Sequence, residues 1–202
     1  MLKKVYEERR SVNNFNSEKP LEEALLKEII DLAVLAPSAF NLQPWRLIAV
    51  QTEEGKDKLL PLAFNQPKIK QAPVTLILVA DKDGYKAENP VWSELKELAG
   101  EDNAKGAMEM AAGLYGTSEE CQLKFAESNA GLLAMSIMYA AKGLGVDSHP
   151  MSGMDFEGIH KAFDLKESET VVMLIALGYH DESQTLYPRR LRRGFDQIVE
   201  AV

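Results

Sequence analysis

Residues 118–142 read SEECQLKFAESNAGLLAMSIMYAAK, and this stretch is the longest helix that the sequence predicts. Its first half carries acidic and polar positions, whereas residues 130–141 are apolar almost all round. A helix with that pattern is buried in a large core or between subunits. Gly143 and Gly145 follow closely, and glycine is a common residue just past the end of a helix.

Two apolar runs on either side of this helix predict strands. Residues 73–80 form a continuous β-branched run, which indicates a strand buried on both faces, and residues 171–178 form a second buried strand. Shorter strands are expected at residues 46–50 and 146–148. Residues 150–155 are expected to form a tight loop.

Helices are predicted before and between these strands. An amphipathic helix begins at Pro20 and ends before Pro37. Further helices are expected at residues 2–9, 52–63, 65–71 and 156–163. Residues 81–117 are weakly patterned and predict a lid-like insertion with one or two short helices. The sequence therefore predicts one α+β domain over residues 1–202, with three layers and few strands.

Composition excludes several functional classes. The chain has 202 residues, 46% of them hydrophobic, and a net charge of −8, which argues against a nucleic-acid binder and against docking on an anionic membrane. No apolar stretch reaches the roughly 20 residues of a membrane span, and residues 1–10 lack a secretory apolar region. The single Cys121 makes a cytoplasmic location the default. The histidines His149, His160 and His180 have no metal-ligand spacing and are expected to be surface or satisfied polar residues.

The arginines are unevenly distributed. Six of the seven occur in two clusters, one at each end of the chain, at positions 9, 10, 189, 190, 192 and 193. Two interpretations remain open at this point. The clusters are either solvated helix ends, or a single anion site assembled from both termini.

Four segments carry polar side chains in a recognisable order. They are residues 9–15 (RRSVNNF), 36–45 (APSAFNLQPW), 64–68 (FNQPK) and 145–155 (GVDSHPMSGMD). In this order they resemble the nitroreductase family of FMN-dependent oxidoreductases. The first two segments taken together are the specific part of that resemblance.

The resemblance implies a fold, an activity and an assembly. The fold is a nitroreductase-like three-layer sandwich, with a central, mostly antiparallel sheet flanked by helices, in an intertwined homodimer. The cofactor is tightly bound FMN, with NAD(P)H as a transient hydride donor, and the acceptors are nitroaromatics, quinones or similar flat molecules in a ping-pong cycle. The flavin N5 carries the hydride chemistry, so no catalytic side chain is expected.

The resemblance also assigns the cofactor-binding residues. Phosphate binding is assigned to Arg9, Arg10 and Ser11 together with Arg190 and Arg192. Arg189 or Arg193 could take the place of one of the last two by a register slip. The remaining positions are expected along the flavin ring. They are Pro37, Ser38, Ala39 and Asn41, often supplied by the other subunit; Asn65 and Lys68 at the ring edge; and Pro150, Met151, Ser152 and Gly153 near N5.

Two departures from the family pattern concern redox tuning. Many members have a basic residue where Asn13, a further cofactor-binding candidate, stands, and an acidic one where Ser152 stands. The insertion at residues 81–117 is expected to determine which acceptor binds, and Tyr85, Trp92 and Tyr115 are the aromatic residues expected to contact it. The alternatives are a specialised relative, such as a reductive dehalogenase or a flavin-consuming enzyme, and a non-enzymatic FMN carrier or sensor.

Overall fold

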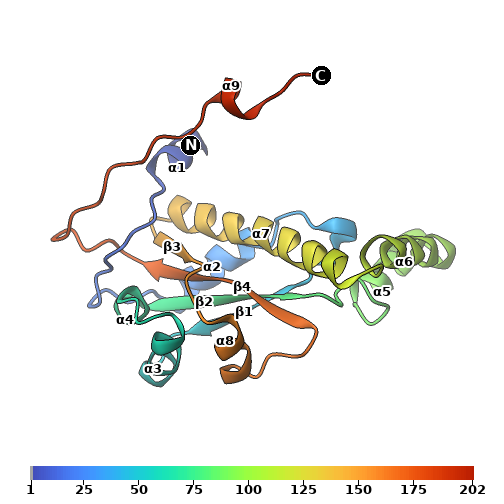
Figure 1. The fold of residues 1–202 in the computed structure, drawn as a ribbon, viewed down its shortest axis with the longest axis horizontal. Coiled ribbons are helices and arrows are strands. Elements are labelled where there is room, and N and C mark those ends of the chain that lie inside the picture. The colour runs from blue at the N-terminus through green and yellow to red at the C-terminus, as the bar shows by residue number, and fades with distance from the viewer. Residues whose placement is uncertain (1) are drawn as a thin grey trace.

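A four-stranded sheet forms the middle layer of the computed structural model, which describes residues 2–202 (Figure 1). Met1, the first residue of the predicted domain, lies outside the described residues. The sheet order is β1-β2-β4-β3, and all three pairings are antiparallel. The predicted mostly antiparallel sheet is confirmed. The strands are β1 (Trp45–Val50), β2 (Val74–Asp81), β3 (Asp147–Met151) and β4 (Glu169–Gly178).

Helices cover both faces of the sheet, which confirms the three-layer prediction (Figure 1). Side chains of β2 alternate between the two faces of the sheet. Leu76 and Leu78 belong to one core cluster, and Ile77 and Val79 belong to the other. The first face packs against α7 (Glu119–Gly143), and α1 (Leu2–Glu8) and α2 (Glu23–Ala33) pack against α7 in turn. The second packs against α3 (Glu53–Leu62), α4 (Lys68–Gln71) and α8 (Phe156–Ala162).

The long helix α7 is fixed at its start and buried along one side. The Ser118 side chain accepts a hydrogen bond from the Cys121 backbone N–H at 3.2 Å, which caps the helix as a serine at this position should. Ala130, Leu133 and Ile137 are fully buried, whereas Leu132 is 48% exposed. One chain therefore covers one face of this helix and leaves part of the opposite face uncovered.

Strand β3 is longer than predicted and includes Pro150 and Met151, which were expected in a loop. Pro150 pairs with Ile175 and Met151 with Leu174. Proline is tolerated because β3 is an edge strand, where a missing N–H breaks no bond on the outer side. The loop therefore begins only at Ser152.

The insertion at residues 81–117 also differs from its prediction. It contains two helices, α5 (Val91–Ala99) and α6 (Glu101–Tyr115), and α6 is 15 residues long rather than short. Tyr85 and Trp92 are almost fully buried, and Tyr115 stacks on Phe125 of α7 with ring centroids 4.3 Å apart. Tyr85 and Tyr115 therefore connect the insertion to Phe125 of α7, whereas the ring of Trp92 lies beside that of Phe40. Contact of these three residues with an acceptor stays a prediction.

The two chain termini run past each other beside the edge strand β3. Ser11 forms a parallel bridge with Ser148, and the C-terminal segment returns past α1 before the short helix α9 (Phe195–Ile198) (Figure 1). Residues 182–202 are exposed throughout. Within the described part of the chain, none of the helices combines the length and apolarity that crossing a bilayer requires.

Candidate functional site

Two predicted segments, far apart in sequence, lie side by side in the structure. The turn that contains Asn65 and the loop that contains Gly153 are joined by two hydrogen bonds. The Gln66 side-chain amide donates to the Gly153 carbonyl at 2.8 Å, and the Asp155 backbone N–H donates to the Leu62 carbonyl at 2.8 Å. The structure therefore brings the predicted ring-edge residues to the predicted N5 loop.

The turn after α3 has an unusual backbone. Phe64 and Asn65 have φ values of 52° and 55°, in the left-handed region that non-glycine residues rarely occupy. The Asn65 N–H closes the turn on the Leu60 carbonyl at 2.9 Å. These two conformations interrupt the helix predicted over residues 65–71, so α4 begins only at Lys68.

Lys68 is a buried cation without an acidic partner. The residue is 9% exposed, and burial lowers the pKa of its ammonium group. Within residues 2–202 its Nζ forms no ion pair, and its hydrogen-bond acceptor is the Gln66 Oε1 at 3.3 Å. A buried charge normally requires a counter-charge, so this position suits an anionic or electron-rich ligand group.

His149 of β3 belongs to the same electrostatic neighbourhood. Its Nδ1 donates to the Val12 carbonyl at 2.8 Å, so the expectation of a satisfied histidine is confirmed at this nitrogen. Burial and then the positive charges of Lys68 and Arg9 lower the pKa of the imidazole. We call Gln66, Lys68, His149 and Gly153 the buried-lysine group. Sequence reasoning missed Gln66 and His149, whose signal was their position inside two of the four segments.

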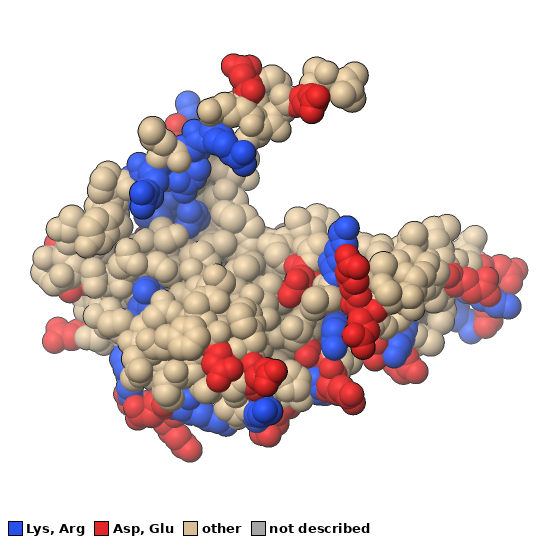
Figure 2. Space-filling model, in the orientation of Figure 1, with Lys and Arg blue, Asp and Glu red and all other residues tan. Residues whose placement is uncertain are grey.

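A second group of cations lies where the termini meet. Burial first, and then the charges of Arg189, Arg192 and Arg10, lower the pKa of the Arg9 guanidinium, against an opposing effect of Tyr139. Figure 2 shows lysine and arginine side chains gathered over α1 and the C-terminal segment. We call Arg9, Arg10, Arg189, Arg190 and Arg192 the arginine cluster. Both termini therefore contribute to one cationic surface.

Side chains of the arginine cluster donate hydrogen bonds to backbone carbonyls. Arg189 donates to the carbonyls of Glu7 at 2.8 Å and Arg9 at 2.7 Å, and Arg10 donates to that of Tyr187. In the described residues none of the cluster pairs with a carboxylate, whereas Arg46 pairs with Glu169 at 2.6 Å.

Of the predicted C-terminal ligands, Arg192 is near enough to Arg9 to affect its pKa. Arg192 also donates to the Arg190 carbonyl at 2.9 Å, whereas no hydrogen bond of the Arg190 side chain occurs in the described chain. Arg189, one of the two register-slip alternatives, fastens the C-terminal end of α1 instead. Ser11 and Asn13 are exposed beside Arg9 and Arg10, on either side of the buried Val12.

The segment with Pro37, Ser38, Ala39 and Asn41 does not join these groups within one chain. It packs on the α7 face, where the Ala39 N–H donates to Asn129 Oδ1 at 2.8 Å. The segment leads into β1, whereas Gly153 follows β3 at the opposite edge of the sheet. Three strand spacings separate these edges, which is about 14 Å. One chain therefore holds only part of the predicted site.

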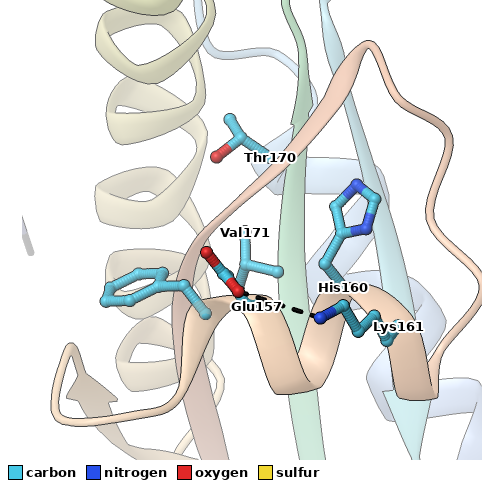
Figure 3. A pocket seen from close by; sticks show the side chains of 6 residues that line it. Glu157, His160, Lys161, Thr170 and Val171 are labelled. Atoms are coloured by element: carbon cyan, nitrogen blue, oxygen red, sulfur yellow. Dashed lines mark ion pairs between the residues drawn. The ribbon is translucent and has the colours of Figure 1, made fainter.

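A small cavity lies elsewhere, between α8 and β4 (Figure 3). Its volume is about 190 Å³, and Glu157 and Lys161 form an ion pair at 3.8 Å beside it. The other lining residues are Phe156, His160, Thr170 and Val171. None of the predicted cofactor residues lines it, and it is smaller than the cavities that hold ligands of flavin size.

The fold and the site together define a three-layer α+β protein with cations gathered at one edge of its sheet. A family model described as the nitroreductase family matches residues 6–179. NAD(P)H nitroreductase MhqN of Bacillus subtilis, a provisional name, is 32% identical over 96% of this chain and 95% of that protein. The chain belongs to the nitroreductase family and is an oxidoreductase.

Solved structures of similar proteins agree with this assignment. A provisionally assigned nitroreductase of Bacillus subtilis, ydfN, matches with a TM-score of 0.91 and 30% identity, over 99% of this chain and 98% of that one. A provisionally assigned nitroreductase of Exiguobacterium sibiricum, crystallised in complex with FMN, matches with a TM-score of 0.87 and 25% identity, over 100% and 97% of the two chains. The predicted nitroreductase-like fold is confirmed.

Proposed function

We propose that this chain is an FMN-dependent oxidoreductase that takes hydride from NAD(P)H and passes it to nitroaromatic, quinone or similar flat acceptors. One observation carries the proposal: the chain holds two sets of uncompensated cations, one buried and one exposed. FMN is a ligand with two matching parts, a flat ring that gains negative charge on reduction and a doubly charged phosphate. The FMN complex of the Exiguobacterium sibiricum relative supports the same cofactor.

The residues divide between the two parts of the cofactor. Arg9, Arg10 and Ser11, with Arg190 and Arg192, would bind the phosphate, because guanidinium groups and hydroxyls are strong donors to phosphate oxygens. Bound FMN would supply the hydride-accepting atom. Lys68 and Asn65 would bind the polar edge of the ring, and the Ser152 and Gly153 backbone would face N5. Asn13, being neutral, would leave Lys68 as the main cation near the ring.

A homodimer would complete the site. Pro37, Ser38, Ala39 and Asn41 lie on the other face of the sheet from Lys68, so they would reach the flavin bound by a second copy of the chain. The partly uncovered face of α7 and the exposed apolar side chains of the C-terminal segment, such as Phe195 at 72%, support that contact. A monomeric mass by sedimentation at micromolar concentration, with FMN retained, would contradict the dimer.

The cycle would be ping-pong, with nicotinamide stacking transiently on the flavin and leaving before the acceptor binds. Tight FMN binding and a cytoplasmic location are parts of the same proposal. The test is a visible absorption spectrum of the purified protein, followed by anaerobic titration with NADH and NADPH and then with an acceptor. We expect a yellow protein that is bleached by one or both nucleotides and recoloured by the acceptor. A colourless protein that cannot be loaded with FMN overturns the proposal.

A further inference from the structure

Gln66 occupies a bridging position that none of the predicted site residues explains. Its Nε2 donates to the Gly153 carbonyl at 2.8 Å, and its Oε1 accepts from the Lys68 Nζ at 3.3 Å. A carboxamide can donate from its nitrogen and accept at its oxygen without carrying charge. One side chain therefore connects the buried cation to the loop after β3.

The local backbone is strained in a way that places this side chain. Phe64 and Asn65 adopt left-handed conformations directly before Gln66, and for a bulky residue such as Phe64 that conformation is a true outlier. Phe64 is also 64% exposed, so burial of its ring does not compensate the strain. Strain of this kind persists where the surrounding structure imposes it, and it gathers at functional sites.

Both partners of Gln66 are hydrogen-bonded to it directly. Within the described chain, Gln66 Oε1 is the acceptor that Lys68 uses, and no carboxylate pairs with this ammonium group. A Cβ built at Gly153 would meet a single neighbouring atom within 4 Å, the Gln66 Nε2 at 3.7 Å. In the direction that a side chain would take, Gly153 therefore faces the Gln66 amide.

We propose that Gln66 is a positioning residue that sets the electron affinity of the bound flavin. It holds the Lys68 ammonium and the Gly153 peptide in a fixed relation, so that negative charge developing on the reduced ring meets a preorganised cation. The inference rests on the proposed FMN-dependent function. It assigns no direct contact between Gln66 and the acceptor, so it concerns the potential of the flavin rather than acceptor choice.

The main test compares the midpoint potential of FMN bound to the wild-type protein and to Gln66→Met, which keeps the length of the side chain and removes both hydrogen bonds. We expect the preference for reduced over oxidised FMN to fall about tenfold, the scale of one hydrogen bond to a charged group. That fall equals a potential about 30 mV more negative for a two-electron couple. Gln51→Met, an exposed glutamine at the end of β1, is the matched control and should leave the potential unchanged.

A double-mutant cycle separates positioning from a general effect on the fold. In a Lys68→Met background the Gln66→Met change should alter the potential much less, because the cation that the amide orients is gone. In flavin-free protein, Gln66→Met should speed hydrogen exchange at residues 152–154 while exchange in β2 stays unchanged. This second measurement tests the contact without cofactor or turnover.

Each outcome decides the inference. An unchanged potential in a folded, FMN-loaded Gln66→Met variant overturns it and leaves the proposed function standing, as does strict additivity in the cycle. A wild-type protein that does not bind FMN overturns the proposed function and this inference with it.

Discussion

The buried-lysine group and the arginine cluster are both positively charged, but they are built in opposite ways. Lys68 lies under the turn after α3, is 9% exposed, and is held by a neutral side chain. The arginine cluster lies between two chain ends. Arg10, Arg189 and Arg192 donate to backbone carbonyls, Arg190 faces solvent, and Arg9 is half-buried. Lys68 of the first group is buried within the fold, whereas the second group is a junction of two segments that begin and end the chain.

This difference predicts different physical behaviour. Charges in a buried site are weakly screened by salt, whereas exposed charges are screened over about 10 Å at 0.1 M ionic strength. The arginine cluster should therefore make phosphate binding strongly salt-dependent. The buried-lysine group should set the properties of the ring largely independently of salt. Substitutions at members of each group test this comparison.

The largest effect is expected from removing the predicted C-terminal phosphate ligands. Arg190→Ala combined with Arg192→Ala should weaken FMN binding by several kcal/mol, at about 1.5–3 kcal/mol per charged hydrogen bond lost. Riboflavin, which lacks the phosphate, should bind the double variant and the wild type equally well. Fluorescence titration at two salt concentrations measures both ligands. Lys105→Ala with Lys124→Ala removes the same charge elsewhere, and equal losses in both double variants would move the phosphate site away from Arg190 and Arg192.

A Lys68→Met variant should change two properties in opposite directions. Removing a buried cation without a carboxylate partner should stabilise the flavin-free protein by about 1 kcal/mol, since the ammonium no longer loses its hydration on folding. The same change should weaken binding of reduced FMN about tenfold or more and lower the flavin potential. Calorimetry of the flavin-free form and an anaerobic redox titration test the two halves. A loss of stability without FMN would show that Lys68 is a structural lysine.

Arg189 should act on the junction rather than on the ligand. Arg189→Gln removes the donor that fastens the C-terminal segment to the carbonyls at the end of α1, where a cation also favours the helix dipole. We expect faster proteolysis after residue 181 in flavin-free protein, together with FMN binding weakened several-fold. Arg193→Gln removes the same charge from the same segment, and no hydrogen bond of its side chain occurs in the described chain. Identical proteolysis of the two variants would contradict a fastening role.

The smallest effect concerns the pH dependence of stability at His149. Burial and nearby cations hold the pKa of His149 below its ordinary value near 6.5 in the folded chain. Between that lowered pKa and 6.5 the unfolded chain binds more protons, so stability rises with pH in this window and is lost as the pH falls through it. His149→Gln should flatten this part of the curve by less than about 1 kcal/mol. Urea unfolding of flavin-free protein from pH 5 to 7 measures it, with His160→Gln as control, and an unaltered slope would place the titration elsewhere.

Much of the fold was predictable because its signals are local. The buried strands β2 and β4 are continuous apolar runs, and the start of α7 is marked by a capping serine. The errors occur where a local signal is weak or misleading. Pro150 indicates a loop, but an edge strand tolerates a proline. The glycines within α6 weaken the helical signal of a segment that forms a helix because its packing stabilises it.

The sequence was enough to predict which segments belong to the candidate site, but not how these segments contact one another. The sequence placed Asn65, Lys68, Ser152 and Gly153 in two segments. The structure joins these segments through Gln66, whose signal was its position inside one of them. The C-terminal arginines were predicted as a cluster. Their division into Arg189, which fastens α1, and Arg192, which lies near Arg9, depends on the path of the chain.

By itself, the sequence predicted the order of the elements from short-range pattern. Its four motifs, through their resemblance to a known family, also predicted the family and the residues expected around a flat anionic cofactor. Only the tertiary structure decided which cations are buried, which carbonyls they meet, and that Pro37 to Asn41 lie on the opposite face of the sheet from Lys68. Burial and distance arise from contacts between residues far apart in sequence. The long helix α7 depends on both pattern and tertiary structure. Its apolar pattern predicts that packing partners cover it, and the structure shows that one chain covers only part of its surface.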